Sequence, residues 1–154
     1  MSSSLAGCHA LVTGAGSGIG AAVARELAAR GARVSLAGRR LAKLEETAAA
    51  LRQFAGEIIP LDVTDASAVT RAIAGVALPI DILVNNAGRA VSAPFGKTDP
   101  ALFDEMINVN LRSVFLVTKA VLPQMQKRGS GRIINIASVA GLAGAAYVSA
   151  YVAA

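Results

Sequence analysis

Short apolar runs alternate along this chain with longer segments in which apolar residues recur every three or four positions. An apolar run that stops at glycine is typical of a buried strand, and four-residue spacing is typical of an amphipathic helix. The first strand is predicted at Cys8–Thr13, and Ile19, Val23 and Leu27 mark an inward face of the first helix, which ends before Gly31. Later strands are predicted at Arg33–Ala37, Glu57–Leu61, Ile80–Val84 and Arg132–Ala137.

Helical spacing fills the gaps between these strands. A second helix carries Leu41, Leu44, Ala48 and Leu51, and a third spans Ala66–Ala77. A fourth, long helix begins behind an Asp-Pro pair at 99–100, because aspartate caps helices and proline suits their first position. Its expected core positions are Phe103, Ile107, Val114, Val117 and Val121, with a kink in its last turns at Pro123.

Five strands separated by four helices predict βαβ crossovers, and therefore a parallel sheet with helices on both faces. The strands are apolar throughout, as expected for strands hidden on both sides. We expect one doubly wound α/β domain over residues 1–154, without a linker or repeat. Such sheets commonly have six strands. The chain stops at Tyr151–Ala154, in what reads as a sixth helical segment, so C-terminal strand-helix units are expected to be missing.

The composition narrows the range of functions. With 54% hydrophobic and 16% charged residues, the chain is too apolar for a disordered segment. Its single cysteine, Cys8, and single histidine, His9, exclude a disulfide framework and a Ser-His-Asp triad, and we expect no metal site. Both are interpreted as ordinary strand residues. The net charge is +5, but scattered basic residues and 4% aromatics argue against nucleic-acid binding.

Two uncharged stretches, at 5–24 and 133–154, are long enough to span a bilayer. Glycine, serine and asparagine interrupt both, which is not expected of a membrane-spanning helix. The N-terminal residues Met1–Ser4 include no basic residue, so a signal peptide is not expected. We therefore expect a cytoplasmic protein that does not bind membranes.

A glycine-rich turn, Thr13-Gly-Ala-Gly-Ser-Gly-Ile-Gly20, follows the first strand and opens the first helix. Glycines let the backbone approach a pyrophosphate, and a helix N-terminus favours anions. The turn lacks the Gly-Lys-Ser/Thr ending of nucleotide-hydrolase phosphate loops. It favours a dinucleotide site, although its spacing differs from Gly-x-Gly-x-x-Gly and a glycine-rich turn without a ligand is the alternative.

The spacing Thr13-Gly-x-x-x-Gly-x-Gly20 resembles the short-chain dehydrogenase/reductase family. Further matches follow in order: Asp62-Val63, Asn85-Asn-Ala-Gly88, Asn110, and Ser138 thirteen residues before Tyr151. The resemblance extends from about Gly7 to the last residue. It implies a Rossmann-type fold and an oxidoreductase that transfers hydride between a nicotinamide cofactor and a small-molecule carbonyl compound or secondary alcohol.

The resemblance also implies the cofactor contacts. Asp62 would accept from the adenine amino group, with a helix cap as the alternative, and the Val63 amide would serve a ring nitrogen. Asn86 and Gly88 would lie near the ribose, while Asn85 would be structural. The residues of the turn expected to bind the cofactor are Gly14, Ser17, Gly18, Ile19 and Gly20.

The residues at the end of the second strand indicate whether NADP(H) or NAD(H) is preferred. NAD-preferring relatives carry an acidic residue where this chain has Gly38, followed by Arg39-Arg40. No carboxylate there opposes a 2′-phosphate, and Arg39 can bind one through charge-assisted hydrogen bonds. We expect NADP(H), with NAD(H) as the alternative. The other interpretation of Arg39-Arg40 is an ordinary solvated pair of charges. It is favoured more for Arg40 than for Arg39.

For catalysis, the resemblance implies Tyr151 as the proton donor or acceptor and Ser138 as a hydrogen-bond donor to the substrate oxygen. Tyr147 is a rival, but the thirteen-residue spacing selects Tyr151. Asn110 resembles the asparagine that holds a water in the proton relay, with helix packing as its alternative.

The family's Tyr-x-x-x-Lys motif would place its lysine one position beyond Ala154. A truncated, nucleotide-binding fragment without activity is therefore the alternative function. Relatives pair through the long helix and the tyrosine helix, so a homo-oligomer is expected of the full-length parent protein.

Overall fold

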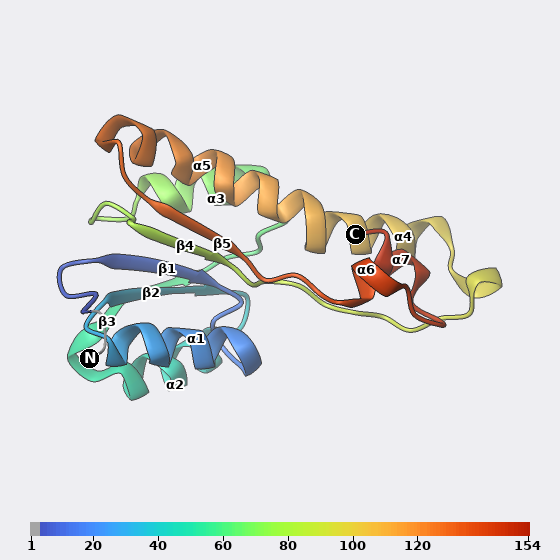
Figure 1. Ribbon diagram of the computed structural model, residues 1–154, viewed down its shortest axis with the longest axis horizontal. Coiled ribbons are helices and arrows are strands. Elements are labelled where there is room, and N and C mark those ends of the chain that lie inside the picture. The colour runs from blue at the N-terminus through green and yellow to red at the C-terminus, as the bar shows by residue number, and fades with distance from the viewer. Residues whose placement is uncertain (1–3) are drawn as a thin grey trace.

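The structure, a computed structural model, describes residues 4–154. Its centre is a five-stranded, all-parallel sheet with the order β3-β2-β1-β4-β5 (Figure 1). The predicted α/β Rossmann-type sheet is confirmed, and the strand ends differ from the prediction by at most two residues. The strands are β1 (His9–Thr13), β2 (Arg33–Gly38), β3 (Ala55–Pro60), β4 (Ile82–Asn85) and β5 (Arg132–Asn135).

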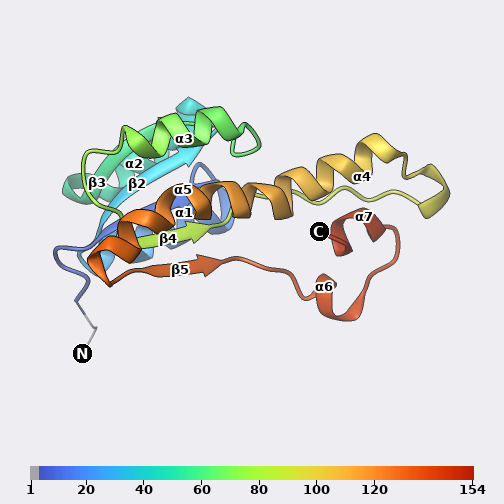
Figure 2. The same ribbon diagram turned by 90° about the horizontal axis from the view of Figure 1, so that it is seen from above.

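Helices cover both faces of the sheet (Figure 2). Side chains of a strand point alternately to its two faces. Ala10 and Val12 of β1 accordingly join an apolar cluster with α1 and α2, whereas Leu11 joins a second cluster with α3 and α5. The helices are α1 (Gly18–Ala29), α2 (Leu41–Leu51), α3 (Ala66–Ala74), α4 (Pro100–Ile107), α5 (Ser113–Arg128), α6 (Ala140–Ala143) and α7 (Ser149–Val152), with 3-10 turns η1 (Arg52–Phe54) and η2 (Phe95–Lys97).

Helix α1 packs on the sheet mainly through small side chains, which corrects the predicted inward position of Ile19. Ile19 is 62% exposed, whereas Val23 and Leu27 are partly buried and pack against the core cluster as predicted. Small residues allow the helix backbone to lie close to the strands, so the larger side chains are left at the margin. The buried residues of α1 are Gly20, Ala21, Ala24 and Ala28.

The predicted long helix has two α-helical parts joined by a π-helical segment, η3 (Asn108–Arg112). Its start is as expected, since Asp99 accepts from the Leu102 N–H at 2.8 Å. The π-helical interruption was not predicted; α5 continues through Pro123 as one helix, and the kink at that residue stays a prediction. The Asn110 side chain donates to the Met106 carbonyl one turn earlier at 3.1 Å and so competes for a backbone acceptor.

Two of the expected burial assignments are wrong. Phe103 of α4, expected in the core, is 43% exposed. Strand β5 is not hidden on both sides either, since Ile134 is 43% exposed at the outer edge of the sheet (Figure 2). Within the described residues, no helix combines the length and apolar character needed to cross a membrane. The signal-peptide expectation rests mainly on residues 1–3, outside the described part of the chain.

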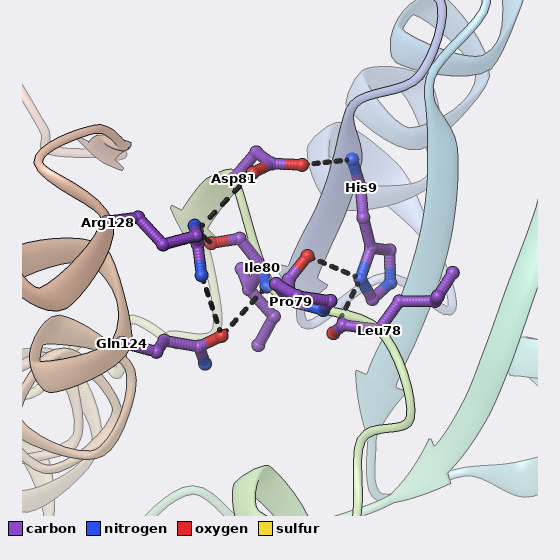
Figure 3. A network of polar contacts seen from close by, with 7 residues as sticks. All are labelled: His9, Leu78, Pro79, Ile80, Asp81, Gln124 and Arg128. Atoms are coloured by element: carbon purple, nitrogen blue, oxygen red, sulfur yellow. Dashed lines mark hydrogen bonds and ion pairs between the residues drawn. The ribbon is translucent and has the colours of Figure 1, made fainter.

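A polar network joins the start of β1 and the end of α5 to the segment before β4 (Figure 3). His9 is buried, and its Nδ1 lies 3.1 and 3.2 Å from the carbonyl oxygens of Leu78 and Pro79. Because carbonyls only accept, these contacts assign the ring proton to Nδ1. The ring's Nε2 then accepts from the Ser35 hydroxyl at 2.8 Å. His9 is thus a strand residue with a structural role, as predicted.

The same network continues through Asp81. Its carboxylate accepts from the His9 backbone N–H at 2.8 Å and pairs with Arg128 at 3.3 Å. Gln124, one turn earlier on α5, accepts from the Ile80 N–H at 3.0 Å (Figure 3). These contacts fix the end of α5 to the amino end of the sheet, opposite the glycine-rich turn.

Candidate functional site

A pocket of about 920 Å³ opens at the carboxyl ends of the first four strands. It is bounded by the turn after β1, the ends of β2 and β3, the segment after β4, and one face of α4 and η3. Gly18 and Gly20 belong to the same turn but do not line the pocket. Eight of the ten predicted cofactor residues do line it: Gly14, Ser17, Ile19, Arg39, Asp62, Val63, Asn86 and Gly88.

The glycine-rich turn is bonded to the segment after β4. Thr13 Oγ1 accepts from the N–H groups of Asn86 and Ala87, both at 3.0 Å. In return, Asn86 Nδ2 donates to the carbonyls of Thr13 and Gly14, at 3.0 and 3.3 Å. A Cβ on Gly20 would lie 2.4 Å from both Asn86 Nδ2 and the Gly14 carbonyl oxygen. Glycine is therefore required at position 20 by this close approach, and the Asn86 amide is committed to the turn.

The start of α1 has the character of an anion site. Gly18 has a φ of +55°, and a Cβ there would meet nothing within 4 Å. Ser17 caps the helix by position but accepts no backbone N–H, and the first turn holds no acidic residue. The first N–H groups of a helix lack partners within the helix and carry its positive partial charge. These features fit a pyrophosphate group.

Two arginines and no carboxylate follow β2. Arg39 is exposed and lines the pocket. Arg40, interpreted from sequence as a solvated charge, instead donates from Nη2 to the Ser17 hydroxyl at 2.8 Å, across to the glycine-rich turn. The structure therefore adds Arg40 to the candidate site. An anionic group bound at this end of the pocket would meet two guanidinium groups.

Asp62 lies on the loop after β3, and its carboxylate accepts hydrogen bonds. Its Oδ1 accepts from the Thr64 N–H at 3.0 Å and the Thr64 hydroxyl at 2.7 Å. These two bonds, with the charge of Arg39, hold the pKa of Asp62 below its ordinary value. Its other oxygen, Oδ2, makes no hydrogen bond within residues 4–154. The helix-cap alternative for Asp62 is wrong, because Asp65 caps α3.

Asn110 connects η3 to the segment after β4. Its Oδ1 accepts from the Arg89 N–H and its Nδ2 donates to the Arg89 carbonyl, both at 3.0 Å. A Cβ on Gly88 would lie 2.7 Å from the same Oδ1. The side chain therefore ties η3 to the segment after β4, and the water-holding role and its helix-packing alternative both stay predictions. Asn85, predicted to be structural, similarly donates to Thr118 and Asn135 at 3.0 and 2.9 Å.

Ser138 and Tyr151 lie outside the pocket lining. Ser138 follows β5 and accepts from the Ala140 N–H at 3.2 Å, while Tyr151 is half-buried in α7. No hydrogen bond joins them within the described residues. The rival Tyr147 is 64% exposed, has a φ of +63°, and accepts through its carbonyl from the Ala93 N–H at 2.6 Å. Sequence spacing alone thus links Ser138 and Tyr151.

One wall of the pocket was missed from the sequence. Spacings of three and four residues place its members on one helical face, and this was the signal that could have found them. Two charged members bond to other pocket-lining segments: Glu105 pairs with Arg89, and Arg112 Nη1 donates to the Thr64 carbonyl at 3.3 Å. The wall consists of Ala101, Asp104, Glu105, Asn108, Val109 and Arg112.

Comparison with known proteins identifies the family of the chain. The family model for short chain dehydrogenases matches residues 8–154. The chain belongs to the short-chain dehydrogenase/reductase family. It is 38% identical over 152 residues to ketoacyl reductase HetN from Nostoc sp., covering 96% of this chain and 53% of HetN. The chain thus spans about half the length of this family relative.

Two solved short-chain dehydrogenase/reductase structures show the same fold. Serine dehydrogenase from Escherichia coli is 37% identical, with a TM-score of 0.88, over 94% of this chain and 68% of its own. A variant of actinorhodin polyketide ketoreductase, solved with NADPH, is 38% identical, with a TM-score of 0.89, over 95% of this chain and 59% of its own. The chain is thus related to oxidoreductases.

Proposed function

We propose that this short-chain dehydrogenase/reductase transfers hydride between NADP(H) and a small carbonyl compound or secondary alcohol. The observation that carries the cofactor choice is the pair of guanidinium groups, Arg39 and Arg40, beside the glycine-rich turn. A 2′-phosphate distinguishes NADP(H) from NAD(H), and arginine binds phosphate through several charge-assisted hydrogen bonds. The relative solved with NADPH supports the same choice.

The residues present fit this cofactor. The N–H groups at the start of α1 would bind the pyrophosphate, Asp62 Oδ2 and the Val63 N–H the adenine, and the two arginines the 2′-phosphate. Because the Asn86 amide is committed to the turn, we assign only the backbone of the 86–88 segment to the ribose. When bound, the nicotinamide supplies the hydride in reduction and accepts it in oxidation.

The chain's own residues handle the proton. In reduction, Tyr151 would give its phenolic proton to the carbonyl oxygen as the carbon receives the hydride, and the product is a secondary alcohol. In oxidation, Tyr151 would take that proton back. The Ser138 hydroxyl would donate a hydrogen bond to the same oxygen, and Asn110 would support a water behind the tyrosine. Pairing of identical chains and a cytoplasmic location are further parts of this proposal.

Fluorescence titration with NADPH and with NADH tests the cofactor assignment. Wild-type protein should bind NADPH more tightly. Arg39→Ala should weaken NADPH binding by about 1.5–3 kcal/mol, the value of a hydrogen bond to a charged group, which is roughly a 10- to 150-fold change. NADH binding should stay unchanged. Equal loss for both cofactors, or no binding by the wild type, would overturn the assignment.

Consumption of NADPH in the presence of a panel of ketones tests the reaction itself. Tyr151→Phe should abolish turnover and leave NADPH binding intact, because it removes one hydroxyl and keeps the ring. Tight NADPH binding by the wild type without turnover on any ketone would instead support the alternative, a nucleotide-binding chain without activity.

A further inference from the structure

Arg112 occupies an unusual place on the wall of the pocket. It is the last residue of η3, and its Nη1 reaches the Thr64 carbonyl on the loop that carries Asp62. Its side chain is exposed and lines the pocket. No carboxylate within residues 4–154 forms an ion pair with it, whereas Glu105 on the same wall pairs with Arg89. The guanidinium is thus anchored at one nitrogen, and it makes no other hydrogen bond or ion pair within residues 4–154.

The surroundings of Arg112 fit a flat, polar aromatic ring. Arg112 contacts the loop whose residues Leu61, Asp62 and Val63 also line the pocket, and Asp62 Oδ2 makes no hydrogen bond within residues 4–154. A guanidinium stacks on the face of an aromatic ring, and this contact needs planarity as well as charge. The two arginines assigned to the 2′-phosphate lie after β2 instead, so Arg112 is on a different element.

We propose that Arg112 closes the adenine end of the pocket and stacks its guanidinium plane on the purine ring. The hydrogen bond to Thr64 holds the plane in place beside the loop that reads the edge of the ring. Arg112 is then a determinant of affinity for the adenine half of the cofactor, independent of the 2′-phosphate. This inference rests on the proposed function, because it needs an adenine dinucleotide in the pocket.

Titrations of Arg112→Met and Arg112→Lys with NADPH and NADH test the proposal. Arg112→Met should lower the affinity for NADPH and for NADH by the same factor, roughly 2- to 10-fold, because both cofactors carry adenine. Arg112→Lys should bind both cofactors as weakly as Arg112→Met does, because lysine keeps the charge and a donor for Thr64 but has no planar face. Arg39→Ala, which should affect NADPH alone, provides the comparison within the same site.

Two controls separate stacking from other roles. Arg25→Met removes an exposed α1 arginine that makes no side-chain hydrogen bond within the described residues, and should change neither affinity. The thermal midpoint of each variant without cofactor should match the wild type. Rescue by Arg112→Lys, a loss confined to NADPH, unchanged affinities in Arg112→Met, or a lowered midpoint would overturn the proposal. Absence of binding by the wild type would instead count against the proposed function.

Discussion

Position 20 has the least free space in the glycine-rich turn, and Gly20→Ala tests whether this packing holds the turn in place. The added Cβ would lie 2.4 Å from two atoms, the Gly14 carbonyl oxygen and Asn86 Nδ2. Cβ atoms essentially never approach other heavy atoms to under 3.0 Å. Either α1 must move away from the turn, or the turn must move away from β4. In both cases the hydrogen bonds from Asn86 Nδ2 to Thr13 and Gly14 are stretched.

The expected cost follows from this overlap. Adding one methyl to a closely packed site costs about 1–3 kcal/mol of unfolding free energy. For a chain of this size, that corresponds to a fall in Tm of roughly 2–12 °C. NADPH binding should weaken as well, because the same displacement moves the first N–H groups of α1. Circular dichroism melting and cofactor fluorescence measure the two effects.

Gly96→Ala is the matched control, because a Cβ there would meet nothing within 4 Å. It should change neither Tm nor affinity. The double variant Gly20→Ala with Asn86→Ala should lose less stability than the two single losses added, since one of the two clashing atoms is gone. A Tm for Gly20→Ala equal to that of Gly96→Ala, or strictly additive losses in the double variant, would refute the reasoning.

Two further outcomes are expected away from the turn. Ser35→Ala leaves the buried Nε2 of His9 and the Glu57 N–H without their partner, so urea unfolding should show a loss of about 1–3 kcal/mol with NADPH affinity unchanged. Bonds from the Ala68 N–H and the Ser67 hydroxyl lower the pKa of Asp65, so its stabilisation is present above its ordinary pKa and lost as pH falls through the lowered value. Asp65→Asn keeps a capping oxygen that does not titrate, and its stability should fall less than that of the wild type between about pH 6 and pH 3; equal falls would contradict this assignment.

Much of the fold could be predicted from sequence because each element repeats one simple period. Strands such as β1 and β4 are hidden on both sides, and their apolar runs stop at turns. One position on the predicted inward face of α1, Ile19, was assigned wrongly for a physical reason. Hydrophobic periodicity favours large side chains, whereas close helix-sheet packing uses small ones, so Ala24 is buried and Ile19 is exposed.

The site was predictable where backbone chemistry restricts the residue type. Glycine is required at positions 14 and 20 because neighbouring atoms lie too close for a Cβ. Asp62 could be found because it lies shortly after the end of a strand. Contacts made by long side chains were not predictable, because they depend on which elements meet in space. The bond from Arg40 to Ser17 and the bond from Arg112 to Thr64 span 23 and 48 residues of sequence.

The π-helical segment sets the angular relation between two surfaces of one helix. Helix α4 and the π-helical segment itself present the pocket wall, and after the segment α5 presents Val117, Val121 and Met125 to the sheet. Each residue added to or removed from a helix rotates everything beyond it by about 100°. Deleting a single residue within Asn108–Arg112 would therefore turn one surface away from its target while the other stayed in place. Differences in length between variants of this chain should therefore be tolerated least within the π-helical segment at the middle of the long helix.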